Sequence, residues 1–213
     1  MIRRAFFLFL AVFSSNGLCG VSVLGTRFFM SDNSQLLNIK IFNDNESDYL
    51  IKSNTDDVNV IITPPLMLLK KNDSNLITII SKEKMATPKD KLINLTITAI
   101  PKSLDINDVN SVSLAIRNHF KIIYRHKELN ESSFNEIGVI NENNHCMLVN
   151  NSDFIFTISL NKNKNEKGGK IFNIKPDERV ALGVANSAEC DSWINFHNEY
   201  DDIIKSVVPT RIK

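Results

Sequence analysis

The chain has 213 residues, and its 25 Lys and Arg against 24 Asp and Glu give a formal net charge of only +1 at pH 7. This balance gives no electrostatic basis for binding nucleic acid or an acidic membrane surface, so we expect neither as a partner. The length suits one large domain or two small ones.

The first 20 residues have the pattern of a secretory signal peptide. The start of the chain carries the basic residues Arg3 and Arg4, residues 5–13 are apolar, and small and polar residues follow. The apolar run is shorter than the roughly 20 residues that cross a bilayer. We therefore expect cleavage after export, between about residues 17 and 21. No later apolar run reaches membrane length, so we expect no stable membrane insertion.

Strand signals dominate from Val21 to Arg125. Short stretches with apolar residues at every second position alternate with turns rich in Asn, Asp and Ser, as in antiparallel β-structure. We expect strands at residues 38–43, 49–53, 58–62, 66–69, 76–80, 92–100 and 112–125. This many short strands, without a convincing amphipathic helix, predict an antiparallel sandwich. One of the two prolyl bonds in Thr63-Pro64-Pro65 is a candidate for the cis form.

A second, smaller β domain is predicted after a polar and charged segment at residues 126–137. We expect its strands at residues 146–149, 154–160, 170–174, 180–184 and 193–196. Gly168-Gly169 is typical of a hairpin tip. The predicted organisation is a signal peptide at residues 1–20, a first domain at 21–128 and a second at 129–213.

The last strand of the first domain is unusual. Its apolar side chains at Val112, Leu114, Ile116 and Phe120 alternate with polar ones, and the row then meets Lys121. An apolar strand of this kind suits an edge that pairs with another chain. The alternative is an ordinary half-buried sandwich strand that ends in a lysine.

Several short motifs follow one another along the chain. They are Thr26-Arg27-Phe28-Phe29, Asn43 followed by Tyr49-Leu50-Ile51, Thr63-Pro64-Pro65, Ala99-Ile100-Pro101, Phe120-Lys121-Ile122-Ile123-Tyr124-Arg125, Val149-Asn150-Asn151 and Asn198-Glu199-Tyr200. In this order the chain resembles the periplasmic pilus-assembly chaperones, the partners of outer-membrane ushers. It departs from that family where His126 replaces a proline, Asp201 and Asp202 replace two glycines, and Asn94 replaces a tryptophan.

The resemblance implies an all-β fold of two immunoglobulin-like β-sandwich domains, set at an angle with a cleft between them. It implies a periplasmic chaperone that binds pilus or fimbrial subunits by donor-strand complementation and delivers them to an outer-membrane usher. In this mechanism the chaperone lends a strand to a subunit sandwich that lacks one. The donated row would be Val112, Leu114, Ile116 and Phe120.

The resemblance also implies two charged groups of residues. Arg27 and Lys121 would receive the C-terminal carboxylate of the subunit, and we expect both side chains to be solvent-accessible at the cleft; alternatively, each is a solvated surface charge. Asp90, Arg125 and Glu199 would form a salt-bridge cluster that holds the two domains at their angle.

Two cysteines, Cys146 and Cys190, remain after export. In an exported protein two cysteines more often pair than stay free, and such a sandwich can bridge two strands across its core. We expect a Cys146–Cys190 disulfide. The alternatives are two unpaired thiols, or a pairing at the end of the sandwich.

Enzymatic motifs are absent from the sequence. His119, His126, His145 and His197 lack metal-ligand spacing, and there is neither a Gly-x-Ser-x-Gly elbow nor a phosphate loop. We expect no catalytic residue, no metal and no cofactor. The competing hypothesis for function is an exported sandwich protein with structural or adhesive duties at the cell surface.

Overall fold

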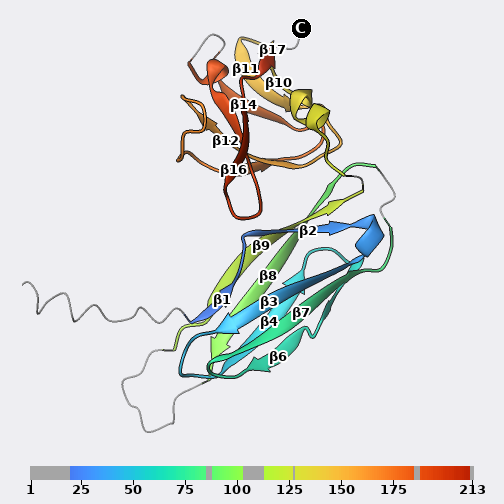
Figure 1. The fold of residues 1–213 in the computed structure, drawn as a ribbon, viewed down its shortest axis with the longest axis vertical. Helices are drawn as coiled ribbons and strands as arrows, with labels where there is room; N and C mark the ends of the chain where they lie inside the picture. The colour runs from blue at the N-terminus through green and yellow to red at the C-terminus, as the bar shows by residue number, and fades with distance from the viewer. Residues whose placement is uncertain (1–19, 85–87, 103–112, 127, 185–187, 212–213) are drawn as a thin grey trace, which may run out of the picture.

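The computed structural model describes residues 20–84, 88–102, 113–126, 128–184 and 188–211. The molecule is all-β and forms two sandwiches, one from each half of the chain, each made of two sheets (Figure 1). The predicted fold class is confirmed. The predicted signal peptide falls almost entirely outside the described residues, which begin at Gly20.

The first sandwich packs a sheet of order β1-β3-β7-β5 against a sheet of order β2-β9-β8-β4-β6. Its elements are β1 Val21–Val23, β2 Arg27–Ser31, the short 3-10 helix η1 Asp32–Ser34, β3 Leu36–Asn43, β4 Tyr49–Thr55, β5 Val60–Thr63, β6 Leu66–Leu69, β7 Asp73–Ser81, β8 Lys91–Pro101 and β9 Ile116–Arg125. Alternation along the strands builds the core, because successive side chains point to opposite faces of a sheet. In β8, for example, Ile93, Leu95, Ile97 and Ala99 are all at most 2% exposed.

The N-terminal strand changes sheets at a glycine. β1 pairs with β3 in one sheet, whereas β2 pairs with β9 in the other. Between them Gly25 has φ of +100°, a conformation that residues with a side chain rarely adopt. This crossing brings Arg27 to the first position of β2, beside the second domain.

The second sandwich packs a sheet of order β14-β11-β10-β17 against a sheet of order β13-β12-β15-β16. Its elements are the 3-10 helix η2 Glu131–Glu136, β10 Ile137–Glu142, β11 His145–Asn150, β12 Phe156–Asn161, β13 Phe172–Ile174, β14 Arg179–Val184, the 3-10 helix η3 Ala188–Asp191, β15 Trp193–His197, β16 Ile203–Val207 and β17 Thr210–Arg211. Phe134, Phe156 and Phe196 meet in its core with ring centroids 4.9–5.4 Å apart, within the range of favourable aromatic pairs.

One buried asparagine serves each sandwich in the same way. The Asn43 side-chain amide donates to the carbonyls of Ser47, Leu69 and Lys70. The Asn150 amide donates to those of Phe154, Ile174 and Lys175. Both residues are at most 1% exposed, so each satisfies loop carbonyls that would otherwise be buried without a partner.

The predicted strands are all present with shifted ends, and the Thr63–Pro64 bond is cis. Gly168 and Gly169 have positive φ, but the β12–β13 connection spans residues 162–171, so they lie in a longer loop and not at a tight hairpin tip. The strands β1, β10, β16 and β17 were not predicted. β10 starts inside the polar segment taken as the domain boundary, and β16 lacks a clean alternation, with Ile203 and Ile204 adjacent.

Candidate functional site

Arg27 and Lys121, the proposed carboxylate anchor, are neighbours in the structure. β2 and β9 pair in parallel, and their register sets Arg27 directly beside Lys121. The Lys121 backbone N–H also donates to the carbonyl of Thr26 at 3.4 Å. Residues paired across a sheet project from the same face, so the fold brings together two cations that lie far apart in the sequence.

Arg27 is buried, at 7% exposed, so the expectation of a solvent-accessible side chain is wrong for this residue. Its cover is the Asn198–Asp202 turn between β15 and β16, which extends from the second domain to the start of β2 (Figure 1). Arg27 Nη2 donates to the carbonyl oxygen of Asn198 and to Oδ1 of Asp201, each at 2.5 Å. Its Nε is buried without a hydrogen-bond partner.

Lys121 has a separate set of partners and is half-buried. Its Nζ donates to Oδ1 of Asn94, the residue opposite it on β8. The Asn94 backbone N–H donates to Asp56 Oδ1 at 2.8 Å, and its side-chain amide donates to the other oxygen of the same carboxylate. Burial acts to raise the pKa of Asp56, but the Asn94 hydrogen bonds and the Lys121 charge outweigh it, so the pKa lies below its usual value. Each cation of the pair thus has an acidic group of this chain close by.

The sequence interpretation did not assign Asp201, Asn94 or Asp56 to this site. For Asp201 and Asn94, the signal available in the sequence was that both depart from the family pattern. In the resemblance described above, Asp201 takes the place of a glycine and Asn94 that of a tryptophan, and each contacts one of the two cations.

β9 has a half-open edge next to the anchor. On one side it pairs with β8 from Ile116 to Tyr124, but on the other it pairs with β2 only from Lys121 onward. Among the described strands, none pairs with residues 116–120 on that second side. The unpaired N–H and C=O groups of such an edge are a template for another strand.

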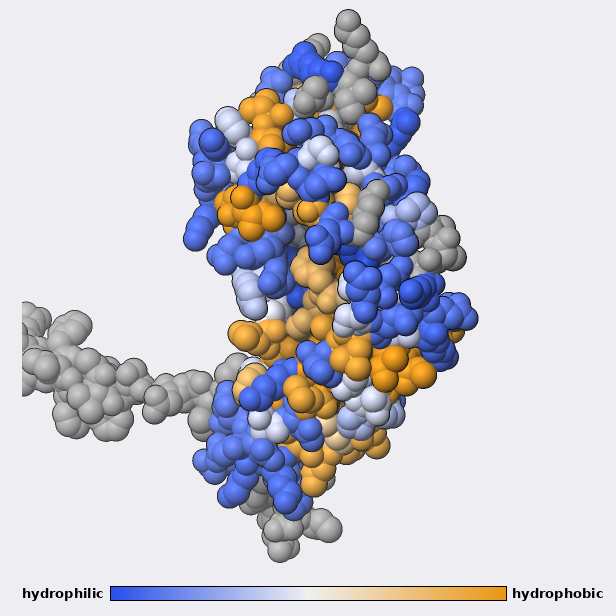
Figure 2. Space-filling model, turned by 45° about the vertical axis from the view of Figure 1, so that its right-hand side comes forward, coloured by the Kyte–Doolittle hydropathy of each residue, from blue (hydrophilic) through white to orange (hydrophobic). Residues whose placement is uncertain are grey.

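The predicted donor row divides in the structure. Leu114 and Ile116 are 72% and 48% exposed, and Figure 2 shows apolar side chains gathered on the surface of the first domain. Val112 lies outside the described residues. Phe120 does not fit its predicted place in the donated row. It is only 9% exposed and packs against Phe28, with ring centroids 5.8 Å apart. Because it fills the core of its own domain, it is not available to a subunit in this structure.

Two of the three predicted interdomain charges meet. The Asp90 side chain is 1% exposed and accepts from Arg125, with N–O distances of 2.9 Å. It also accepts from the backbone N–H of Ile155 at 3.0 Å, and Arg125 Nη2 donates to the Ile155 carbonyl at 3.1 Å. Burial raises the pKa of Asp90, and the Arg125 charge only partly offsets this. This network connects β8 and β9 of the first domain to the segment just before β12.

The prediction that Glu199 joins the salt-bridge cluster with Arg125 is wrong in this structure. Among the described residues, its carboxylate forms no ion pair with Arg125. Its backbone carbonyl accepts instead from the Thr26 N–H and hydroxyl, both at 3.4 Å. The β15–β16 turn points this residue toward the start of β2, and Asp201, two residues later, is the acid that pairs with an arginine of the first domain.

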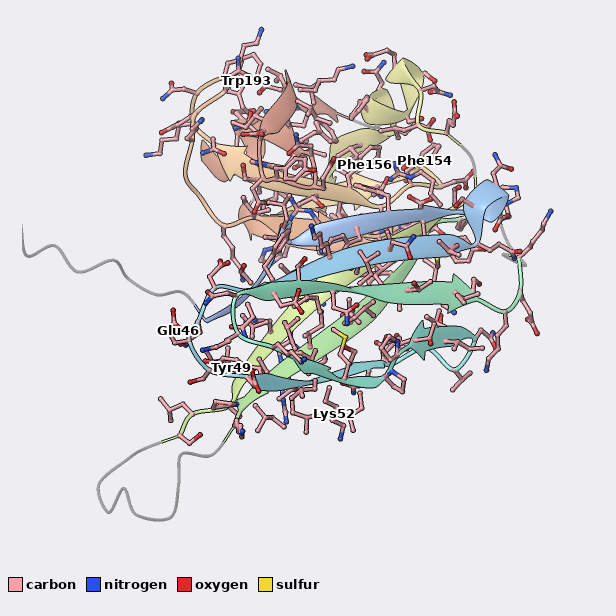
Figure 3. The ribbon with its side chains drawn as sticks, turned by 60° about the horizontal axis from the view of Figure 1, so that its bottom comes forward. Glu46, Tyr49, Lys52, Phe154, Phe156 and Trp193 are labelled. Atoms are coloured by element: carbon pink, nitrogen blue, oxygen red, sulfur yellow. The ribbon has the colours of Figure 1, made fainter. Side chains whose placement is uncertain are left out.

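Aromatic rings complete the contact between the domains. The Arg125 guanidinium lies 5.1 Å from the ring centroid of Phe29 and 5.3 Å from that of Phe154, within the range of cation–π attraction. Phe154 and Phe156 lie on the side of the second domain that faces the first (Figure 3). A small cavity of about 110 Å³ remains between these groups.

The predicted Cys146–Cys190 disulfide is not formed between these two described residues. They are 0% and 5% exposed in the core of the second domain. Burial, with a hydrogen bond from Cys190 and its charge as smaller causes, raises the pKa of Cys146 to about 12. The two thiols are therefore neighbours that contact each other through a hydrogen bond in place of the expected covalent bond.

These features define a class of protein: two sandwiches joined by a buried ion pair, with an open apolar strand edge that leads into two cations. The chain belongs to the family described as pili and flagellar-assembly chaperones, whose PapD N-terminal domain matches residues 20–130. No helix among the described residues is long and apolar enough to cross a membrane.

Known proteins of similar sequence and structure are fimbrial chaperones. The chain is 26% identical to the chaperone protein FanE of Escherichia coli over 186 residues, 82% of this chain and 79% of FanE. Its fold matches the crystal structure of the periplasmic chaperone SfaE with a TM-score of 0.69 and 21% identity, over 91% of this chain and all of SfaE. It also matches the Salmonella enterica SafA pilin–SafB chaperone complex with a TM-score of 0.70 and 17% identity, over 90% of this chain and 96% of the matched one.

Proposed function

We propose that this chain is a periplasmic chaperone that binds and stabilises pilus subunits by donor-strand complementation and delivers them to an outer-membrane usher. The observation that carries the proposal is the open edge of β9, where the exposed Leu114 just before the strand and Ile116 at its start lead to the neighbouring Lys121 and Arg27. The alternative of a structural or adhesive surface protein is not favoured, because the relatives are chaperones.

The open edge supports the strand-donating part of the proposal. An incoming strand would pair with the free main-chain groups of residues 116–120, while Leu114 and Ile116 would enter an apolar groove of the subunit. Full burial of such a side chain contributes about 1.5–3 kcal/mol, so the two, which already bury part of their surface, would add about 2–4 kcal/mol. Val112 would extend the same row.

The cation pair supports the anchoring part. A strand that slips by two residues keeps the same face buried, so apolar contacts alone do not fix its register. A carboxylate bound at one end does fix it, because charge-assisted hydrogen bonds require a definite position. Arg27 and Lys121 lie at the end of the open edge, where a subunit chain that pairs with β9 would reach them.

The relatives support the cellular setting that we propose. A cleaved signal peptide at the N-terminus would export the chain to the periplasm, where pilus subunits pass on their way to the outer membrane. The SafB structure, a chaperone in complex with a pilin, has the same fold as this chain.

The test is co-expression with a cognate pilin and co-purification from periplasm. Leu114→Asp places a charge in the subunit groove and Lys121→Ala removes part of the anchor, so both variants should fold normally and lose most of the complex. The matched controls are Leu66→Asp, at an exposed leucine on β6 (54% exposed, against 72% for Leu114), and Lys52→Ala on β4, both away from β9. Wild-type yields of complex from both Leu114→Asp and Lys121→Ala would refute the proposal.

A further inference from the structure

We infer that Asp201 is a built-in competitor for the carboxylate that the anchor receives, so that a subunit must displace the Asp201 side chain from Arg27 to bind. The inference rests on the proposed function and adds to it a residue that sets the affinity and specificity of the anchor. Asp201 Oδ1 accepts from Arg27 Nη2 at 2.5 Å, a contact between a carboxylate and a guanidinium. A C-terminal carboxylate would make the same kind of contact.

Nη2 of the buried Arg27 cannot bind the carboxylate of Asp201 and the C-terminal carboxylate of a subunit at the same time. The same Nη2 atom already donates to Asp201 and to the carbonyl of Asn198, and the side chain is only 8% exposed. An external carboxylate would therefore have to displace Asp201 to bind Nη2 while the turn stays in place. The buried Nε, which has no partner, shows that Asp201 leaves part of the donor fork of Arg27 unused.

The Asn198–Asp202 turn is built so that it can leave as a unit. It holds its own shape through bonds from Asn198 N–H to Asp202 O at 3.0 Å, from Asp201 N–H to Asn198 O at 3.3 Å and from Tyr200 N–H to Asn198 Oδ1 at 2.9 Å. Besides those from Arg27, the hydrogen bonds that the turn accepts from the start of the first domain come, in the described part of the chain, from Thr26, and each is 3.4 Å long. The two short contacts that hold the turn on the first domain are thus those of Arg27 Nη2 with the Asn198 carbonyl and with Asp201, and a subunit carboxylate would replace the second.

Lys121 differs from Arg27 in this respect. Its partner Asn94 is neutral, and Asp56 contacts it only through Asn94. Lys121 is also half-buried, whereas Arg27 is buried. An incoming carboxylate would therefore meet Lys121 first, and Arg27 would follow once Asp201 has moved away.

The neighbouring acids provide a matched pair of variants. Asp201→Asn removes the competing charge and keeps the turn, because Asn tolerates the φ of +66° at this position. Asp202→Asn makes the same change of net charge one residue later. The Asp202 backbone bonds within the turn, but no ion pair of its side chain is found in the described part of the chain.

The experiment measures the affinity of purified protein for two synthetic peptides by fluorescence anisotropy. Both peptides alternate Thr and Val, and one ends in a free carboxylate while the other ends in an amide. The readout is the ratio of the two affinities, which a change in fold or in strand pairing alone would not move. We expect Asp201→Asn to raise this preference for the free carboxylate about tenfold, which corresponds to about 1.4 kcal/mol. Asp202→Asn should leave it unchanged, and added salt should reduce the effect.

The outcomes separate this inference from the proposed function. If the wild type prefers the carboxylate peptide, and Lys121→Ala or Arg27→Ala abolishes the preference, the result supports the proposal that Arg27 and Lys121 bind the carboxylate. An unchanged preference in Asp201→Asn would then overturn only the role of Asp201, and an equal rise in Asp202→Asn would reduce it to a general charge effect. Equal binding of both peptides by the wild type and by Asp201→Asn, or no binding at all, would count against the anchor as well as the competitor.

Discussion

The buried pair of Asp90 and Arg125 offers the sharpest test of how the two domains are held together. Asp90→Ala removes an acceptor that serves Arg125 and the Ile155 N–H, and it leaves both groups without that partner. Removal of one member of a buried pair costs about 3–5 kcal/mol. For a chain of this size that corresponds to a fall of about 10 °C in Tm.

Asp90→Asn should behave differently, because its amide oxygen still accepts a hydrogen bond. The raised pKa of Asp90 means that burial of the charged form is unfavourable even beside Arg125. A group whose folded-state pKa is raised contributes stability below its unfolded-state pKa and loses it as the pH rises through the folded-state value. The stability of the wild type relative to Asp90→Asn should therefore decline as the pH rises from about 4.

The assay is thermal unfolding followed by circular dichroism between pH 4 and pH 8, with Asp177→Ala as the control. Asp177 pairs with Lys89 across the same two domains, but both side chains are exposed, so we expect little or no change in Tm. A wild-type Tm for Asp90→Ala would refute the assignment of the buried pair. An equal loss in Asp90→Asn and Asp90→Ala would show that the charge, and not the acceptor geometry, is what stabilises the contact.

Three further predictions follow from burial. Cys146 and Cys190 should resist alkylation in the folded protein and both react after unfolding without reductant; a mass spectrum with no alkylated thiol would show that they are bridged. Phe120→Ala should cost about 3–5 kcal/mol in urea unfolding, as for a core phenylalanine, whereas Leu114→Ala should stay within about 0.5 kcal/mol because the side chain is exposed; equal losses would contradict their assignment to core and surface. Asn150→Ala should cost about 2–4 kcal/mol, since several buried carbonyls lose their donor, and an unchanged unfolding midpoint would contradict that role.

The sequence by itself determined the local structure of this protein and its family. A strand with one buried face requires apolar residues at every second position, and that pattern is readable without knowledge of the partner strand. It located β8, where the side chains expected inside are buried, as well as β3 to β7. The motif order along the chain was sufficient to indicate the chaperone family, which the match over residues 20–130 shows.

The tertiary structure decided which side chains face one another. Phe120 and Leu114 belong to the same alternating row, but only Phe120 has a second sheet packed over it, so one is core and the other surface. Asp201, Glu199 and Asp202 are acids of one short turn, and only the docking of that turn on β2 brings Asp201 to Arg27. Such contacts depend on how two sandwiches meet, and residue periodicity carries no information about a partner that is remote in the chain.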